Sequence, residues 1–321
     1  MEKLLEVKNL RTYFPRRYRP PVKAVDGITY DVRPGELVAI VGESGCGKTV
    51  GILSLTRLNP PTSRIVGGVV SWRDKDLTRI PVEDLQKIRG KEIAMIFQNP
   101  LSSLNPLMTI GRQMTEPLQI HFAMGHKESV QEAKKILARV SIPDIESKMA
   151  AYSFQLSGGM RQRVMVAMAL CCNPRLLIAD EPTTALDATT QAQILELIAS
   201  ANKKDGRATI LVTHDLGIVA RYADTVHIMY AGRIVESADC AELYSRPQHP
   251  YTEALLKAVP RLNRSEEYEL APISGFPPRL DQLGPGCPFE PRCKRRQKPC
   301  AGETPPFRVL SSNHSVSCWE I

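Results

Sequence analysis

The chain has 321 residues, of which 43% are hydrophobic and 24% charged, and its formal net charge is +8. These fractions are typical of a soluble globular protein with one large or two ordinary domains. The basic balance fits phosphorylated ligands, nucleic acid or an anionic membrane surface, but no basic patch interleaved with aromatic residues favours one of them.

Neither a signal peptide nor a membrane span is predicted. The amino terminus, MEKLLEVKNL, has no long apolar core, and the most apolar stretch, VMVAMALCC, is far shorter than the ~20 residues that cross a bilayer. We therefore expect a protein inside the cell, at most peripheral to a membrane, whose cysteines stay reduced.

Short apolar runs with strand character are each followed by a helical pattern. The three pairs are LVAIV (37–41) with KTVGILSL (48–55), LLIAD (176–180) with TQAQILELIAS (190–200), and ATILVT (208–213) with LGIVARYA (216–223). This order predicts an α/β fold in which crossover helices join parallel strands. Residues 99–158 have a mostly helical pattern and are expected to form a subdomain inserted between strands. Beyond residue 247 prolines accumulate, so we divide the chain into residues 1–247 and a small Cys-rich extension, 248–321.

The segment GESGCGKT fits the phosphate-binding pattern G-x-x-x-x-G-K-(S/T), with a strand before it and a helix after it. Its glycines let backbone N–H groups turn toward phosphate oxygens, and the helix start adds positive charge. Lys48 is expected to reach the outer phosphates, and the Thr49 hydroxyl to bind Mg²⁺. A helix start can also lower a thiol pKa, so we expect Cys46 to be sensitive to alkylation. The predicted nucleotide-binding residues here are Gly42, Glu43, Ser44, Gly45, Cys46, Gly47, Lys48 and Thr49.

The segment LLIADEP ends a buried strand with two carboxylates. Asp180 is expected to hold Mg²⁺ directly or through water, because this ion prefers few carboxylates together with phosphate oxygens and waters. Glu181 points elsewhere and is expected to polarise an attacking water. Alone, the two acids would be interpreted as a capping pair at a strand–helix junction, but the neighbouring P-loop makes that interpretation weak.

The segment LSGGMRQR places Ser157, Gly158 and Gly159 at the start of a helix, where a hydroxyl, free amides and the helix dipole favour an anion. The chain also contains the P-loop, LLIADEP, ALD and a histidine after a strand, in the same order as in one family. The set resembles the nucleotide-binding subunit of ATP-binding cassette (ABC) transporters. This resemblance implies a RecA-like core with a β subdomain and an inserted helical subdomain.

The resemblance also implies roles for residues outside these segments. Gln98 matches the glutamine that contacts Mg²⁺ or the lytic water, Asp187 the aspartate at the dimer seam, and His214 the histidine that contacts the γ-phosphate. Phe14, or else Tyr13, matches the aromatic residue that stacks on adenine. In this family LSGG of one subunit completes the nucleotide site of the other, so two cassettes close on two ATP molecules.

The sequence is most similar in pattern to the dipeptide/oligopeptide/nickel import branch of the family. The segments that carry this resemblance are QNPLSSLNPLMTIGRQ, DEPTTALDATTQAQIL and RPQHPYTEALLKAVP. It implies an ATPase at the cytoplasmic face of the inner membrane that energises uptake of peptides or a related solute. Its expected partners are two membrane permeases, a second ABC ATPase and, through the permeases, a solute-binding protein. The alternative is a non-transport ABC ATPase acting on nucleic acid or the ribosome; no nucleic-acid partner is expected.

Four cysteines gather in the extension, three of them in GCPFEPRCKRRQKPC. The import branch carries a tail of this form, and several members hold an iron–sulfur cluster there. The resemblance implies a 4Fe–4S cluster on Cys287, Cys293, Cys300 and Cys318. Four thiolates also suit Zn²⁺, and unliganded thiols remain a third possibility.

Overall fold

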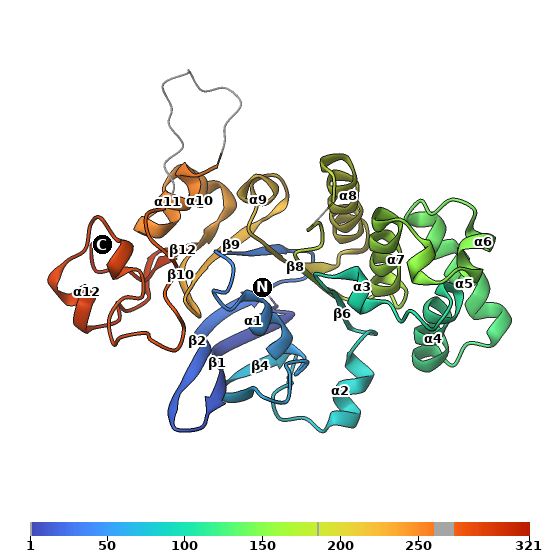
Figure 1. The fold of residues 1–321 in the computed structure, drawn as a ribbon, viewed down its shortest axis with the longest axis horizontal. Coiled ribbons are helices and arrows are strands. Elements are labelled where there is room, and N and C mark those ends of the chain that lie inside the picture. Colours follow the sequence, from blue (N-terminus) through green and yellow to red (C-terminus); the bar gives the residue numbers. More distant parts are fainter. Residues whose placement is uncertain (1, 185, 260–272) are drawn as a thin grey trace, which may run out of the picture.

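The computed structural model describes residues 2–184, 186–259 and 273–321. Its main sheet has eight strands in the order β11-β12-β10-β9-β3-β8-β7-β6 (Figure 1). Five neighbouring strands of this sheet are parallel: β9 (Thr225–Tyr230), β3 (Leu37–Val41), β8 (Ala208–Thr213), β7 (Leu176–Asp180) and β6 (Ile93–Ile96). The predicted α/β fold with parallel strands is therefore confirmed.

Each predicted strand–helix pair is present. The helices that follow the strands are α1 (Lys48–Leu55), α8 (Ala188–Asp205) and α9 (Leu216–Tyr222). The strands β3, β7 and β8 are buried along their whole length, as expected of parallel strands covered on both faces. Helices α8 and α9 cover one face of the main sheet, and α1 lies on the other (Figure 1).

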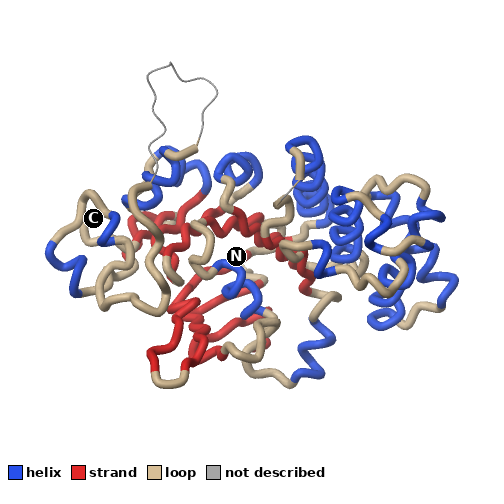
Figure 2. Tube along the Cα trace, viewed as in Figure 1, coloured by secondary structure: helices blue, strands red, loops and turns tan. Residues whose placement is uncertain are grey.

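A second, antiparallel sheet packs below α1. Its strands, in spatial order, are β2 (Arg19–Val32), β1 (Leu5–Arg16), β4 (Arg64–Trp72) and β5 (Lys75–Asp76). Figure 2 shows these strands as a separate red layer below the main sheet. One apolar core joins the two sheets, because Val7, Ile52 and Ile210 belong to the same buried cluster. Helix α2 (Val82–Ile88) connects this layer back to β6.

A set of helices lies between β6 and β7, which are neighbours in the main sheet. They are α3 (Pro100–Ser103), α4 (Ile110–Phe122), α5 (His126–Arg139), α6 (Ile145–Ala150), the 3-10 turn η1 (Ser153–Gln155) and α7 (Gly158–Leu170). They form the right-hand lobe of Figure 1, where α4, α5 and α6 lie beyond α7. The chain thus leaves the sheet after one strand and returns for the next, as the helical pattern predicts.

The carboxyl-terminal segment continues the main sheet. Its elements, preceded by β10 (Arg233–Asp239), are α10 (Cys240–Ser245), α11 (Pro250–Lys257), η2 (Glu290–Arg292), α12 (Lys298–Gly302), β11 (Arg308–Ser311) and β12 (His314–Val316). Strand β12 pairs antiparallel with β10, with Glu236 opposite Val316. The segment therefore supplies two strands to the edge of the main sheet.

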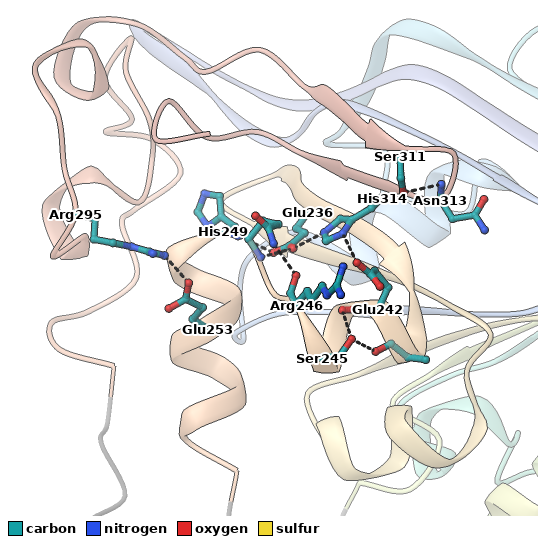
Figure 3. A network of polar contacts seen from close by, with 12 residues as sticks. Glu236, Glu242, Ser245, Arg246, His249, Glu253, Arg295, Ser311, Asn313 and His314 are labelled. Atoms are coloured by element: carbon teal, nitrogen blue, oxygen red, sulfur yellow. Dashed lines mark hydrogen bonds and ion pairs between the residues drawn. The ribbon is translucent and has the colours of Figure 1, made fainter.

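A buried polar network holds this pairing in place (Figure 3). The fully buried carboxylate of Glu236 accepts hydrogen bonds from the backbone amides of Gln248 and His249, at 2.7 Å and 2.9 Å. Its Oε1 atom also lies 2.8 Å from Nε2 of His314, on β12. Since a buried charge is tolerated only when it is paired and hydrogen-bonded, Glu236 ties β10, α11 and β12 together.

Aromatic packing adds a shared apolar core between the carboxyl-terminal segment and the parallel sheet. The Tyr230 ring lies 4.5 Å from Tyr251 and 5.3 Å from Phe289, measured between centroids. All three side chains are buried. In the residues that the structure describes, no helix combines the length and apolar character needed to cross a bilayer.

Candidate functional site

The P-loop joins the buried strand β3 to helix α1 and wraps closely against two other strands. Gly47 has a φ of 106°, and a Cβ atom there would lie 2.1 Å from the carbonyl oxygen of Ala24. A Cβ atom at Gly42 would lie 2.2 Å from the carbonyl oxygen of Met229. Only glycine fits at these two positions, so the strand-turn-helix geometry depends on them.

The Lys48 side chain is buried inside the loop. Its Nζ atom donates to the carbonyl oxygens of Gly42 and Glu43, at 2.8 Å and 3.0 Å. A cation held by two carbonyl dipoles at the start of a helix is well placed to exchange one of them for a phosphate oxygen.

Asp180 ends β7 next to the P-loop helix and is 2% exposed. Burial raises the pKa of its carboxyl group, whereas the Thr49 side chain and the Lys48 ammonium oppose that rise. Among the described residues, nothing hydrogen-bonds to its Oδ1 atom. A buried carboxylate with a free oxygen beside a threonine hydroxyl is the donor set that fits Mg²⁺.

The Glu181 carboxylate contacts the two other side chains predicted to be catalytic. Nε2 of Gln98 donates to its Oε2 atom at 3.0 Å, and Nδ1 of His214 lies 3.4 Å from Oε1. Gln98 comes two residues after β6, Glu181 directly after β7, and His214 directly after β8. Glu181 itself has a φ of 42°, which is rare for a residue with a side chain and turns the chain sharply at the strand end.

The four parallel strands explain why these residues meet. β3, β8, β7 and β6 are neighbours, so their carboxyl ends lie along one edge of the sheet. The P-loop, His214, Glu181 and Gln98 follow those four ends. Ligands of open α/β sheets bind outside the carboxyl ends of the strands. This edge therefore combines an anion cradle, a Mg²⁺ donor set and a hydrogen-bonded carboxylate.

The LSGG segment lies elsewhere. Ser157 caps α7, and its hydroxyl accepts a hydrogen bond from the Met160 amide at 3.3 Å. Figure 1 places α7 beside α8 and the helical lobe, well away from α1. Ser157 and Gly158 are exposed, so this helix start is open to solvent.

Asp187 lies beside this surface. Its carboxylate caps α8 by accepting from the amide and the hydroxyl of Thr190, at 2.9 Å and 2.8 Å. A Cβ atom at Gly159 would lie 3.2 Å from Cγ2 of Thr190. The predicted signature and dimer-seam residues are thus adjacent.

Phe14 and Tyr13 point to opposite faces of β1, because successive side chains of a strand alternate. Phe14 is on the face of Thr12, whose hydroxyl lies 2.8 Å from that of Ser54 on α1. The Tyr13 hydroxyl donates to Asp26 at 2.6 Å instead. The side facing the P-loop helix therefore belongs to Phe14.

Sequence comparison identifies the family. Residues 25–184 match the profile described as ABC transporter, and residues 235–300 match the one described as oligopeptide/dipeptide transporter, C-terminal region. The dipeptide transport ATP-binding protein DppD of Bacillus subtilis is 47% identical over 99% of this chain and 95% of its own length. The chain belongs to the ABC transporter family of ATPases.

Other relatives agree with this assignment of the cassette. The oligopeptide transport ATP-binding protein OppD of Salmonella typhimurium is 43% identical over 99% of this chain and 93% of its own. The ATP-binding cassette MJ0796, solved as a dimer bound to ADP and phosphate, aligns with a TM-score of 0.67 at 27% identity. That alignment covers 74% of this chain and 98% of MJ0796, so the cassette fold predicted from the sequence is confirmed.

The lowered thiol pKa expected for Cys46 is wrong. The thiol is buried inside the P-loop of the cassette, and this burial raises its pKa above the usual value despite the nearby Lys48 ammonium. The helix start does not outweigh the loss of solvent.

The four cysteines of the cassette's extension lie near one another. Burial is the largest cause of the rise in the pKa of Cys287 to about 11, and the other three thiols of the set contribute to it. However, within residues 2–184, 186–259 and 273–321 no three histidine, cysteine or acidic side chains are grouped so as to hold a metal ion. The structure therefore does not confirm the predicted iron–sulfur or zinc site.

Two residues of the extension contact the P-loop, and the sequence analysis did not predict these contacts. The Glu43 amide donates to the Tyr251 hydroxyl at 3.0 Å, and the Glu43 carboxylate pairs with Arg292. Arg292 is 249 residues from Glu43, so no local spacing could have predicted the pair.

Proposed function

We propose that this protein is the ATP-hydrolysing subunit of an importer that takes up dipeptides, oligopeptides or a related solute, acting at the cytoplasmic face of the inner membrane. Catalysis is supported by one observation above all: Gln98 and His214 both contact the Glu181 carboxylate at the sheet edge that carries the P-loop. The solute class is supported by similarity over nearly the whole chain to subunits named for dipeptide and oligopeptide transport. The nucleic-acid or ribosome alternative has no such support.

The roles of the side chains follow from their positions. The P-loop amides and Lys48 bind the phosphates, with Phe14 against the adenine. Thr49, Asp180 and Gln98 would hold Mg²⁺, and the ion would neutralise developing charge on the phosphates. Glu181 accepts a proton from the attacking water, and His214 orients the terminal phosphate. Gln98 donates a hydrogen bond to Glu181, so a movement of the loop after β6 changes the position of the Glu181 carboxylate.

A second cassette completes the site. Ser157, Gly158 and Gly159 lie at the start of α7, which is drawn apart from the P-loop helix α1 in Figure 1. This exposed helix start suits the γ-phosphate bound by a partner. Asp187 lies beside them and would sit at the seam. MJ0796, which was solved as a dimer, offers a precedent. Closure on ATP and opening after hydrolysis would bias two states of an attached membrane protein.

The partners we propose are two permeases, a second and different cassette, and a solute-binding protein that acts through the permeases. We also propose the division into a cassette, residues 1–247, with a helical subdomain at 99–158, and an extension, residues 248–321. The helices between β6 and β7 support the helical subdomain, and in the extension β11 and β12 continue the cassette's main sheet at its edge.

The function is tested by reconstituting the subunit with its permeases and binding protein in liposomes. We expect accumulation of labelled peptides from a mixture, only with ATP and only with this subunit present. ATPase activity that responds to DNA or ribosomes and not to the permeases would contradict the proposal.

We further propose that Cys287, Cys293, Cys300 and Cys318 bind a 4Fe–4S cluster that staples the extension, with Zn²⁺ as the alternative. Four clustered thiols have the right donor chemistry, and their mutual effect on pKa supports their proximity. Ligation would require these thiols to lose protons and approach more closely than in the structure.

Metal analysis of protein purified without oxygen checks this. We expect about four iron atoms per chain and absorbance at ~400 nm. Both should be lost in Cys300→Ala. The matched control is Cys240→Ala, since Cys240 lies outside the four-cysteine set and contacts the Val219 carbonyl. Stoichiometric zinc without iron would contradict the cluster.

A further inference from the structure

One residue of the extension forms a partly buried ion pair with the P-loop. Nη1 and Nη2 of Arg292 lie 2.6 Å and 3.0 Å from the two carboxylate oxygens of Glu43, which is a two-pronged geometry. The Arg292 side chain is 5% exposed. Its guanidinium also donates to the Tyr230 hydroxyl at 3.2 Å and to the Ser274 carbonyl at 3.0 Å, so it is fixed from several sides.

Glu43 is an anion inside a loop whose task is to bind phosphates. Its carbonyl oxygen accepts from Lys48 at 3.0 Å, and its amide is held by Tyr251. Without a partner, a partly buried carboxylate here would repel the phosphates and attract the Lys48 ammonium. The Arg292 guanidinium removes that charge from the loop and turns the Glu43 side chain toward the extension.

A second ion pair joins the extension to β1, the strand that carries Phe14. Nη1 of Arg16 lies 2.7 Å from Oδ2 of Asp281, which is 11% exposed. Arg16 is two residues after Phe14, at the end of β1. The extension therefore contacts both the strand expected to hold the adenine and the loop expected to hold the phosphates.

We propose that Arg292 is a positioning residue for the nucleotide site: it neutralises and orients Glu43, so that the extension sets the affinity of the P-loop for ATP. This inference rests on the proposed function, since it assigns Arg292 to the same site. Removing one partner of a buried pair leaves the other charge uncompensated. Loss of Arg292 should therefore harm ATP binding because Glu43 remains, and loss of Glu43 should repair the damage.

The test measures binding of MgAMP-PNP by calorimetry to the full chain, in Arg292→Ala, Glu43→Gln and the double variant. Arg292→Ala should weaken binding about tenfold, within the range of ordinary coupling between sites. The double variant should recover most of that loss, and Glu43→Gln alone gives the reference for what the carboxylate itself contributes to the loop. Arg296→Ala is the matched control, because it also removes one positive charge from the extension. The Arg296 side chain is 65% exposed and pairs with Glu290, not with the P-loop.

Equal binding by wild type and Arg292→Ala would overturn the inference. So would a double variant as weak as Arg292→Ala, because the arginine would then matter only for packing. Unfolding midpoints without nucleotide check folding; if Arg292→Ala does not fold, Arg292→Lys takes its place, and again Glu43→Gln must restore binding. A wild-type chain that binds no nucleotide would instead refute the proposed function itself.

Discussion

The Glu181→Gln variant is expected to keep ATP affinity and to hydrolyse ATP about a hundredfold to ten-thousandfold more slowly, the usual contribution of a general base. The side-chain carbonyl of the new glutamine still accepts a hydrogen bond from Gln98, so the arrangement of the two side chains is kept. It does not accept a proton from water, so the chemical step slows. The measurement compares single-turnover hydrolysis with equilibrium ATP binding, which separates chemistry from affinity.

The matched control for this variant is Glu132→Gln. Glu132 lies on α5 and pairs with Lys135 at 2.9 Å, away from the sheet edge. It should hydrolyse ATP as fast as the wild type. If Glu181→Gln turns over at the wild-type rate, another group must activate the water, and the geometry around Glu181 must have a different purpose.

The second large effect is expected for Lys48→Ala. The ammonium donates charge-assisted hydrogen bonds, each worth about 1.5–3 kcal/mol. Losing one such bond to phosphate should weaken ATP binding about tenfold to 150-fold. The unliganded fold should change little, because among the described residues the hydrogen bonds of Lys48 go to two carbonyls and a thiol of its own loop.

Lys87→Ala serves as the control for Lys48→Ala, since Lys87 is 74% exposed and pairs with Asp84 on α2. Both variants are titrated with ATP at one ionic strength, because screening alters electrostatic binding. Retention of wild-type affinity by Lys48→Ala would show that the loop does not bind the outer phosphates as assigned.

The central strands and the P-loop could be predicted from local sequence patterns. The runs LVAIV, LLIAD and ATILVT coincide with β3, β7 and β8 because each is a short apolar run bounded by polar turns. The P-loop could be recognised for the same reason, since its strand, its glycines and its helix are contiguous. Glu181 was singled out from the end of the LLIAD run, and Gln98 and His214 by resemblance. The parallel arrangement of three neighbouring strands explains why the three residues meet.

Long-range contacts in the carboxyl-terminal segment could not be predicted in this way. The pairing of β12 with β10 joins residues about 80 positions apart, through three residues that carry no strong strand pattern. The Arg292–Glu43 pair depends on where the chain returns after the aromatic cluster of Tyr230, Tyr251 and Phe289. Burial also reversed the expected pKa shift of Cys46, an effect that depends on tertiary packing and not on helix position.

The central claim is that a nucleotide bound in the Gly42–Thr49 loop is closed off by the helix start of a second cassette. The most direct measurement is a structure of the complete transporter carrying Glu181→Gln, with ATP and Mg²⁺. The account predicts that the γ-phosphate in this P-loop contacts the partner cassette's signature serine, while Ser157 of this chain contacts the partner's nucleotide. An ATP-bound transporter in which neither helix start reaches a phosphate across the subunit boundary would contradict it.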